Sequence, residues 1–116
     1  IYGFAEQGRP VYAECGGLMY LCRVLHAGGA AHPMVGVLDA EVVMHDRLQA
    51  LGYVEVETTR PTLLGAPGVR FRGHQFRYSE LRRGETLAEV FRVHRRRDRA
   101  SFPEGFAWRN VLATYV

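Results

Sequence analysis

Residues 10–22 read Pro-Val-Tyr-Ala-Glu-Cys-Gly-Gly-Leu-Met-Tyr-Leu-Cys, and this stretch decides the predicted fold. Residues 10–13 are typical of a short buried strand. Apolar residues then recur at helical spacing, and the helix is expected to end at the glycine pair 28–29. The apolar face of this helix would consist of Leu18, Leu21, Cys22 and Leu25. The order strand, sharp turn, helix predicts an α/β fold, in which helices flank a mainly parallel sheet.

The sharp turn carries Cys15, followed by Gly16 and Gly17. A helix start presents unpaired N–H groups, which stabilise a thiolate and can bind the oxyanion that forms when a carbonyl is attacked. We therefore predict that Cys15 is a nucleophile at the carboxyl end of a strand and that Gly16 supplies an oxyanion N–H. Glycines beside it avoid crowding and allow unusual backbone angles. The arrangement matches the nucleophile elbow of serine hydrolases, with sulfur in place of oxygen.

The rest of the chain predicts mostly strands. Residues 1–7 indicate the end of a helix that stops at Gly8. Residues 61–68 are expected to form a loop and residues 101–105 a turn, because both are marked by proline and glycine. The strand predictions, from runs of branched and alternating apolar residues, are 34–38, 41–44, 51–57, 69–78, 89–94 and 111–116.

Composition excludes several classes of protein. All fifteen basic residues are arginine, so a Walker-type nucleotide site with its lysine is excluded. The arginine run at 94–99 is interpreted as a solvated loop, and nucleic-acid binding is not expected because no aromatic residues interleave it. No apolar stretch is long enough to span a bilayer, so we expect no membrane contact and a cytoplasmic location. Two cysteines favour neither a disulfide framework nor a metal site, and Cys22 is expected to be a buried thiol.

Four segments, in order, resemble one family over essentially the whole chain. They are the nucleophile segment 8–21, Leu51-Gly52-Tyr53, the segment 72–79 and the final strand 110–116. Together they resemble the C-terminal class I, triad-type glutamine amidotransferase domain of cobyrinic acid a,c-diamide synthases, which has a flavodoxin-like fold. Segment 72–79 favours this group over cobyric acid synthase. Cobyric acid synthase and nickel-sirohydrochlorin a,c-diamide synthase remain the alternatives among tetrapyrrole amidotransferases.

The resemblance implies an ATP-using carbon–nitrogen ligase of cobalamin biosynthesis. Its amidotransferase domain takes ammonia from glutamine through a cysteine thioester, here at Cys15. The ammonia amidates the a and c carboxylates of cobyrinic or hydrogenobyrinic acid, a corrinoid polycarboxylate. ATP and magnesium would bind in an N-terminal domain that the 116 residues do not contain, and no cofactor is expected in this chain itself.

Two departures from the family and the chain end affect the expected site. The family reads Gly-His-Glu-Phe-His-Tyr-Ser, whereas this chain has Gln75 and Arg77 at the glutamate and second histidine positions. By the resemblance, the histidine base would follow directly after Val116. We therefore expect residues 1–116 to be a fragment of a single domain that is inactive alone, poorly soluble, or paired with another chain as in a homodimer.

Several residues keep two interpretations. Glu14 either orients the turn or is an exposed carboxylate beside a helix start. His74 could be a base for Cys15, although a structural or substrate-side role is favoured. Tyr78 and Ser79 could contact substrate or a neighbouring domain. Outside enzymology, the rival hypothesis is a non-catalytic, amidotransferase-like docking module. Arg72 and Arg77 could bind carboxylates, although an exposed strand face is favoured. The predicted substrate-binding or structural residues around Cys15 are therefore Glu14, Gly17, His74, Gln75, Tyr78 and Ser79.

Overall fold

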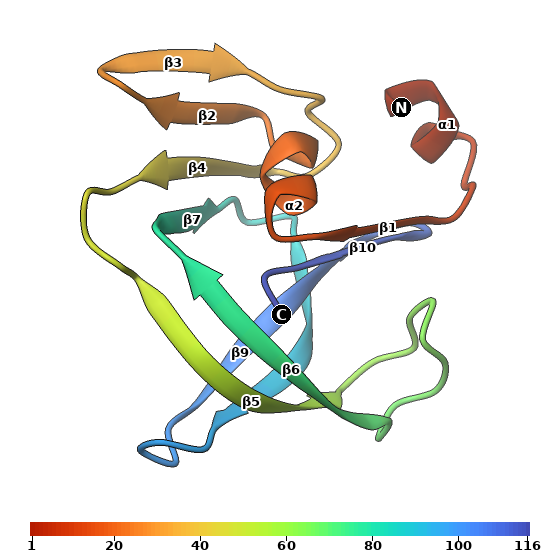
Figure 1. Cartoon of the computed structure of the whole chain (residues 1–116). Coiled ribbons are helices and arrows are strands. Elements are labelled where there is room, and N and C mark those ends of the chain that lie inside the picture. Colours follow the sequence, from red (N-terminus) through yellow and green to blue (C-terminus); the bar gives the residue numbers. More distant parts are fainter.

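The computed structural model describes all of residues 1–116 as two short helices and ten strands (Figure 1). The helices are α1 (Tyr2–Glu6) and α2 (Gly16–Leu21). The strands are β1 (Val11–Glu14), β2 (Val24–Ala27), β3 (Ala30–Pro33), β4 (Ala40–Met44), β5 (Ala50–Thr58), β6 (Arg70–Arg77), β7 (Ser79–Arg83), β8 (Ala88–Arg95), β9 (Ser101–Trp108) and β10 (Val111–Thr114). The predicted α/β class is confirmed.

The strands form two mixed sheets. One has the order β1-β10-β9-β8-β5-β6 and the other the order β3-β2-β4-β7. Only the pairs β1–β10 and β2–β4 are parallel, so the pairing is more antiparallel than the mainly parallel sheet expected from the sequence. Short connections explain the difference, because a turn of a few residues can return a strand only in the antiparallel direction. Strand β1, which leads into the turn and helix α2, nevertheless has a parallel partner in β10, as the predicted fold required.

One long, bent hairpin links the two sheets. Strands β4 and β7 pair in the smaller sheet, and β5 and β6 continue the same two chain segments in the larger one (Figure 1). Across the bend, the N–H of His45 donates to the carbonyl oxygen of Tyr78 at 2.8 Å, and that of Gln49 donates to Arg77 at 2.8 Å. The bend carries the end of β6 to the carboxyl end of β1, where Cys15 lies.

Strand β10 separates two hydrophobic clusters and is buried on both faces. Val111, Ala113 and Tyr115 face the larger cluster with α2 and β4, whereas Leu112 faces the smaller one inside the curled sheet. Each fully buried valine or leucine contributes about 1.5–3 kcal/mol relative to exposure. The strand beside the nucleophile turn is therefore among the best-anchored parts of the fold. The smaller cluster consists of Val54, Val56, Val90, Phe91, Val93 and Leu112.

The helix predicted to run from residue 18 toward the glycine pair is shorter than expected. Helix α2 ends at Leu21, and Cys22 is already extended, with φ −68° and ψ 173°. Residues 24–27 form β2, which pairs with both β3 and β4. Gly28 and Gly29, with φ values of 59° and 73°, form the two-residue turn of the β2–β3 hairpin rather than a helix cap. Strand pairing of residues 24–27 with β3 and β4 therefore overrides the helical spacing of apolar residues, which covered only two turns.

Two further predictions were wrong. Residues 34–38 form no strand; they cross the end of α2, where the N–H groups of Val35 and Leu38 donate to the carbonyl oxygens of Tyr20 and Leu21. Those bonds satisfy helix carbonyls that have no partner within the helix. Residues 101–105 begin β9 and are not a turn. Strand β7 was not predicted.

The remaining elements were predicted correctly within one or two residues. They are α1, β1, β4, β5, β6, the loop 61–68, β8 and β10. Strand β5 alternates between buried and exposed residues, as its period-two pattern predicted. No helix has both the length and the apolar character needed to cross a membrane.

Candidate active site

Cys15 lies at the junction of β1 and α2 in a backbone conformation that residues with a side chain rarely adopt. Its φ is 47° and its ψ −106°. Such conformations cost about 1–3 kcal/mol and persist only where the surrounding structure enforces them. This is the geometry of a nucleophile elbow, in which a strained turn at a strand end presents the side chain above the sheet. The predicted strand, sharp turn and helix around Cys15 is confirmed.

Hydrogen bonds on both sides hold the turn in place. The N–H of Cys15 donates to the carbonyl oxygen of Thr114 at 2.8 Å, and the carbonyl oxygen of Cys15 accepts from the N–H of Met19 at 3.1 Å. Gly17 lies close to β1, since a Cβ there would be 3.2 Å from that of Ala13. Gly16 is exposed, and a Cβ added there would have no other atom within 4 Å. The turn therefore leaves open space in front of the first N–H groups of α2.

The thiol of Cys15 is partly exposed and faces the end of β6. Its Sγ lies 4.0 Å from the carbonyl oxygen of Phe76. The ring of Phe76 is 55% exposed and meets Tyr78 edge to face, with 5.8 Å between ring centroids. The thiol therefore lies between the backbone at the end of β6 and the start of α2.

The second cysteine, Cys22, differs from Cys15 in its burial. Cys22 is fully buried, and its thiol donates to the carbonyl oxygen of Leu18 at 3.3 Å. Burial raises the pKa of Cys22 to about 12, so this sulfur stays protonated in neutral solution. The prediction of a buried thiol at position 22 is confirmed.

The segment 72–79 divides between two faces. His74 is exposed and meets Tyr53 edge to face at 5.0 Å, without a hydrogen bond to Cys15. Gln75 points inward and is 2% exposed, and its amide nitrogen has no hydrogen-bond partner. Tyr78 is 40% exposed beside Phe76. Along β6 the exposed side chains of His74 and Phe76 share the outer face, and it is the backbone carbonyl of Phe76 that reaches the thiol of Cys15.

Three other residues singled out from the sequence have defined partners. Ser79 is buried and donates to the hydroxyl of Tyr115 at 3.0 Å. Glu14 is exposed and accepts from the hydroxyl of Tyr12 at 2.7 Å, so of its two interpretations the exposed carboxylate describes the structure. Arg77 is half-buried, with its guanidinium 4.6 Å from the ring centroid of Tyr115. An exposed strand face is therefore correct for Arg72 but wrong for Arg77.

A buried carboxylate lies next to the site and was not predicted. Glu104 is 4% exposed, accepts from the hydroxyl of Thr114 at 2.5 Å and from the N–H of Tyr115 at 2.7 Å. Burial raises the pKa of Glu104, although these hydrogen bonds oppose the shift. Burial also raises the pKa of Tyr115 to about 12. The sequence signal for Glu104 was obscured because Pro103 and Gly105 indicate a turn.

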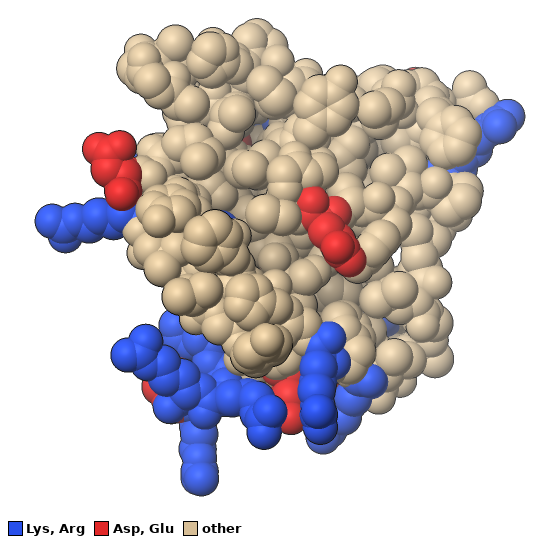
Figure 2. Space-filling model, in the orientation of Figure 1, with Lys and Arg blue, Asp and Glu red and all other residues tan.

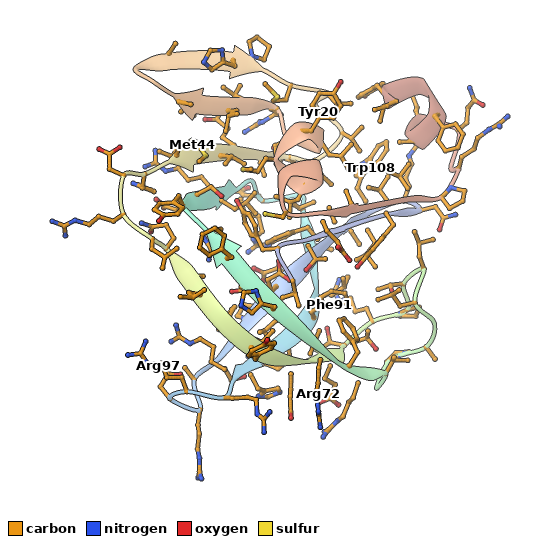
Figure 3. The ribbon with its side chains drawn as sticks, viewed as in Figure 1. Tyr20, Met44, Arg72, Phe91, Arg97 and Trp108 are labelled. Carbon is orange, nitrogen blue, oxygen red and sulfur yellow. The ribbon has the colours of Figure 1, made fainter.

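Arginines gather away from the elbow, at the β8–β9 hairpin and along neighbouring strands (Figure 2). Arg97 and Arg72 both lie at this edge (Figure 3). A cavity of about 650 Å³ opens here, lined by Gln75, Arg95, Arg96 and Arg97 together with residues 48–54. The arginine run therefore forms a hairpin tip, as interpreted from the sequence.

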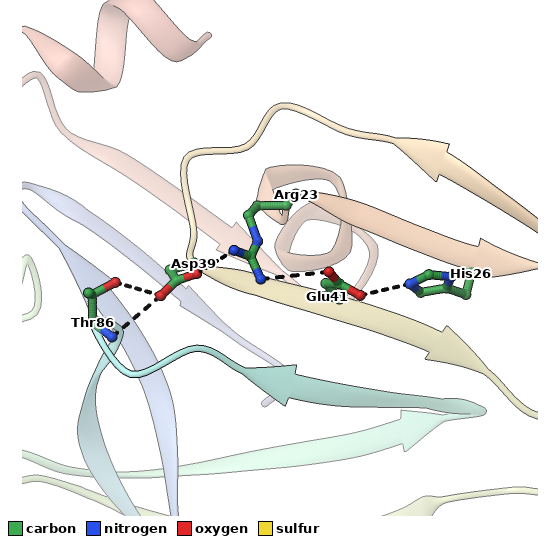
Figure 4. A network of polar contacts seen from close by, with 5 residues as sticks. All are labelled: Arg23, His26, Asp39, Glu41 and Thr86. Atoms are coloured by element: carbon green, nitrogen blue, oxygen red, sulfur yellow. Dashed lines mark hydrogen bonds and ion pairs between the residues drawn. The ribbon is translucent and has the colours of Figure 1, made fainter.

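No three histidine, cysteine, aspartate or glutamate side chains come together as a metal site would require. The acidic groups instead pair with basic ones, as in the network that joins Thr86, Asp39, Arg23, Glu41 and His26 on the smaller sheet (Figure 4). No lysine is available to contact phosphates.

Comparison with known proteins gives a consistent result. A family model described as a CobB/CobQ-like glutamine amidotransferase domain matches residues 1–116. The chain is 44% identical over 110 residues to a cobyrinate a,c-diamide synthase of Leptospira interrogans. This alignment covers 92% of the chain and 24% of the relative. It is 44% identical over 112 residues to the enzyme of that name from Caldanaerobacter subterraneus, covering 96% of the chain and 25% of the relative. A relative of the same name from Archaeoglobus fulgidus is 36% identical over 116 residues, and the alignment covers 100% of the chain and 25% of the relative. The chain spans about a quarter of the length of these relatives.

Proposed function

The chain belongs to the CobB/CobQ-like glutamine amidotransferase domain family, and from this we propose that Cys15 hydrolyses glutamine to supply ammonia for the ATP-dependent amidation of the a and c carboxylates of cobyrinic or hydrogenobyrinic acid. The observation that carries the proposal is the strained turn at Cys15. A thiol at the carboxyl end of β1, directly before a helix, is positioned for attack on a carboxamide carbon.

The proposed reaction follows from the groups around the thiol. The thiolate of Cys15 attacks the side-chain carboxamide of glutamine, and the oxyanion that forms accepts hydrogen bonds from the N–H of Gly16 and its helical neighbour. Ammonia leaves as the thioester forms, and water then releases glutamate. Preorganised donors of this kind are each worth about 3–4 kcal/mol in the transition state of acyl transfer. Since Gly16 carries no side chain, nothing on it blocks the approach to these donors.

The proton of the thiol needs an acceptor, and we propose for it the histidine that the family resemblance places directly after Val116, beyond the carboxyl end of β10. Strands β1 and β10 are parallel, and their register pairs Glu14 with Thr114. The residues that follow these two therefore leave the sheet side by side. A base delivered by β10 would be close to Cys15, whereas His74 on the outer face of β6 would require the strand to rotate.

The part of the proposal that concerns the corrinoid substrate, which receives the ammonia, is based on the relatives. Their name gives cobyrinate as the substrate of those enzymes, and the chain shares 44% of its residues with two of them over nine-tenths of its length or more. Within this chain, the aromatic pair Phe76–Tyr78 and the exposed Arg72 offer apolar and carboxylate-binding surfaces on strand β6 and just after it. We assign these residues no specific contact with the corrinoid.

Covalent labelling tests the proposal. The full-length protein would be treated with a glutamine-like diazoketone, and the labelled peptide identified by mass spectrometry. We expect label on Cys15, protection by glutamine, loss of label in Cys15→Ser and retention in Cys22→Ser, which is the matched control because Cys22 is buried. A folded protein without label at Cys15 would overturn the glutaminase assignment and favour the docking-module hypothesis.

A further inference from the structure

Glu104 occupies the place where the pairing between β9 and β10 stops. The two strands pair up to Ala113 and Phe106, and the same register, if continued, would put Tyr115 opposite Glu104. Between them lies Gly105, whose φ of 64° interrupts the extended backbone of β9. The ladder therefore ends, and the backbone N–H groups of β10 beyond this point need other acceptors.

The carboxylate of Glu104 replaces the missing strand partner. One oxygen accepts from the N–H of Tyr115 at 2.7 Å, and the other accepts from the hydroxyl of Thr114 at 2.5 Å. The hydroxyl oxygen of Thr114 in turn accepts from the N–H of Val116 at 3.0 Å. A single side chain thus fixes three consecutive residues at the end of β10. All of this lies in the interior, where Glu104 is 4% exposed and Thr114 is fully buried.

The same segment holds the strained turn. The carbonyl oxygen of Thr114 accepts from the N–H of Cys15 at 2.8 Å, so one residue is bonded both to Glu104 and to Cys15. Because the conformation of Cys15 is unfavourable by itself, its position depends on these neighbours. The carboxylate forms no hydrogen bond with the thiol of Cys15.

We propose that Glu104 is a positioning residue for Cys15, acting through Thr114 to hold the elbow in its reactive geometry. The catalytic part of this inference rests on the proposed glutaminase function. It assigns Glu104 to orientation rather than to proton transfer, and it predicts an effect on kcat with little effect on the KM for glutamine. Displacements of about 1 Å at a reacting group can lower rates about a hundredfold.

The test compares matched variants of the full-length protein. Glu104→Gln keeps the size of the side chain but replaces one accepting oxygen with a donor, and Glu55→Gln is the control because Glu55 is exposed and forms no ion pair. We expect kcat for glutamine hydrolysis to fall about tenfold or more in Glu104→Gln, with KM changed less than about threefold. Glu55→Gln should match the wild type.

Thr114 gives a second pair that does not require a change at Glu104. Thr114→Ser keeps the hydroxyl and should stay within about threefold of the wild-type kcat, whereas Thr114→Val should lose about tenfold or more. A folded Glu104→Gln protein with wild-type kcat would overturn the inference. So would an active Thr114→Val protein, even if Glu104→Gln failed to fold.

Hydrogen exchange separates this inference from the proposed function. In Glu104→Gln the amides of Cys15 and Tyr115 should exchange about tenfold faster, while that of Val54 in the smaller core cluster stays protected. A uniform loss of protection at all three amides would indicate a purely structural role and overturn the inference. If the wild type hydrolyses no glutamine, the glutaminase assignment fails, and the exchange at Cys15 alone decides whether Glu104 holds the turn.

Discussion

The N–H of Cys15 donates a 2.8 Å hydrogen bond to the carbonyl oxygen of Thr114, across the parallel pair β1–β10. This bond joins a residue near the start of the chain to one near its end. It forms immediately after the last register pair, at the point where β1 turns into α2. The strained geometry at Cys15 is therefore a property of the assembled sheet and not of the local segment alone.

The two cysteines should differ sharply in reactivity. With iodoacetamide at about pH 8, we expect Cys15 to be alkylated and Cys22 to remain unmodified in the folded protein. Burial raises the pKa of Cys22 to about 12 and also blocks access to its sulfur. No arginine or lysine separates the two cysteines, so they share one tryptic peptide, and its fragment ions in tandem mass spectrometry give both rates. Denatured protein is the control in which both should react. Equal rates in the native protein would contradict the burial of Cys22.

Gly105 should not tolerate a side chain. Its φ is 64°, and a Cβ there would collide with the ring of Phe91, which is itself 2% exposed. We expect Gly105→Ala to lower the free energy of unfolding by about 3 kcal/mol, measured by chemical denaturation. Gly3→Ala in α1 is the control, because no atom lies within 4 Å of its added Cβ. It should change stability by less than about 1 kcal/mol, and equal losses in both variants would count against this packing.

Thr58 should anchor the loop 61–68. Its buried hydroxyl donates to the carbonyl oxygen of Ala66 at 3.1 Å and accepts from the N–H of Val69 at 3.0 Å. Thr58→Val keeps the shape but leaves both loop groups without this partner, at an expected cost of about 1–3 kcal/mol. Limited proteolysis should cut the loop faster in this variant. The exposed neighbour provides the control, since Thr59→Val should change stability by less than about 0.5 kcal/mol.

The pair His26–Glu41 should make stability depend on pH. The hydrogen bond with Nε2 of His26, 2.8 Å long, lowers the pKa of the Glu41 carboxyl. A lowered native pKa stabilises the fold above the ordinary carboxyl pKa, and this contribution disappears as the pH falls through the lowered value. We therefore expect Glu41→Gln to lower Tm at about pH 7 and to have a smaller effect at about pH 3. Tm would be followed by differential scanning fluorimetry.

The exposed Glu55 again provides the comparison for this pH dependence. Glu55→Gln should leave Tm unchanged at both pH values, because Glu55 forms no ion pair. A difference between Glu41→Gln and wild type that persisted unchanged at about pH 3 would show that the loss is one of packing and not of the charged hydrogen bond.

The sequence by itself determined the elements with strong local signals. Strand β1 and the turn at Cys15 were predictable because a buried run ends in Cys-Gly-Gly, which only a tight turn accommodates readily. Strands β5 and β6 were predictable from their length and alternation. The resemblance over segments 8–21 and 72–79 pointed to the family that the whole-chain match then showed.

Only the tertiary structure decided the rest, because pairing between distant strands overrides short local patterns. Residues 24–27 have helical spacing, yet β3 and β4 give them sheet hydrogen bonds that a helix extension could not match. Residues 101–105 contain proline and glycine, yet pairing with β8 keeps residues 101–104 in the strand, and Gly105 lies against the ring of Phe91. Glu104 looked like a turn carboxylate until the end of β10 was placed against it. A hydrogen bond between residues far apart in sequence leaves no local pattern, so the support of Cys15 by Thr114 and Glu104 appears only once the chain is folded.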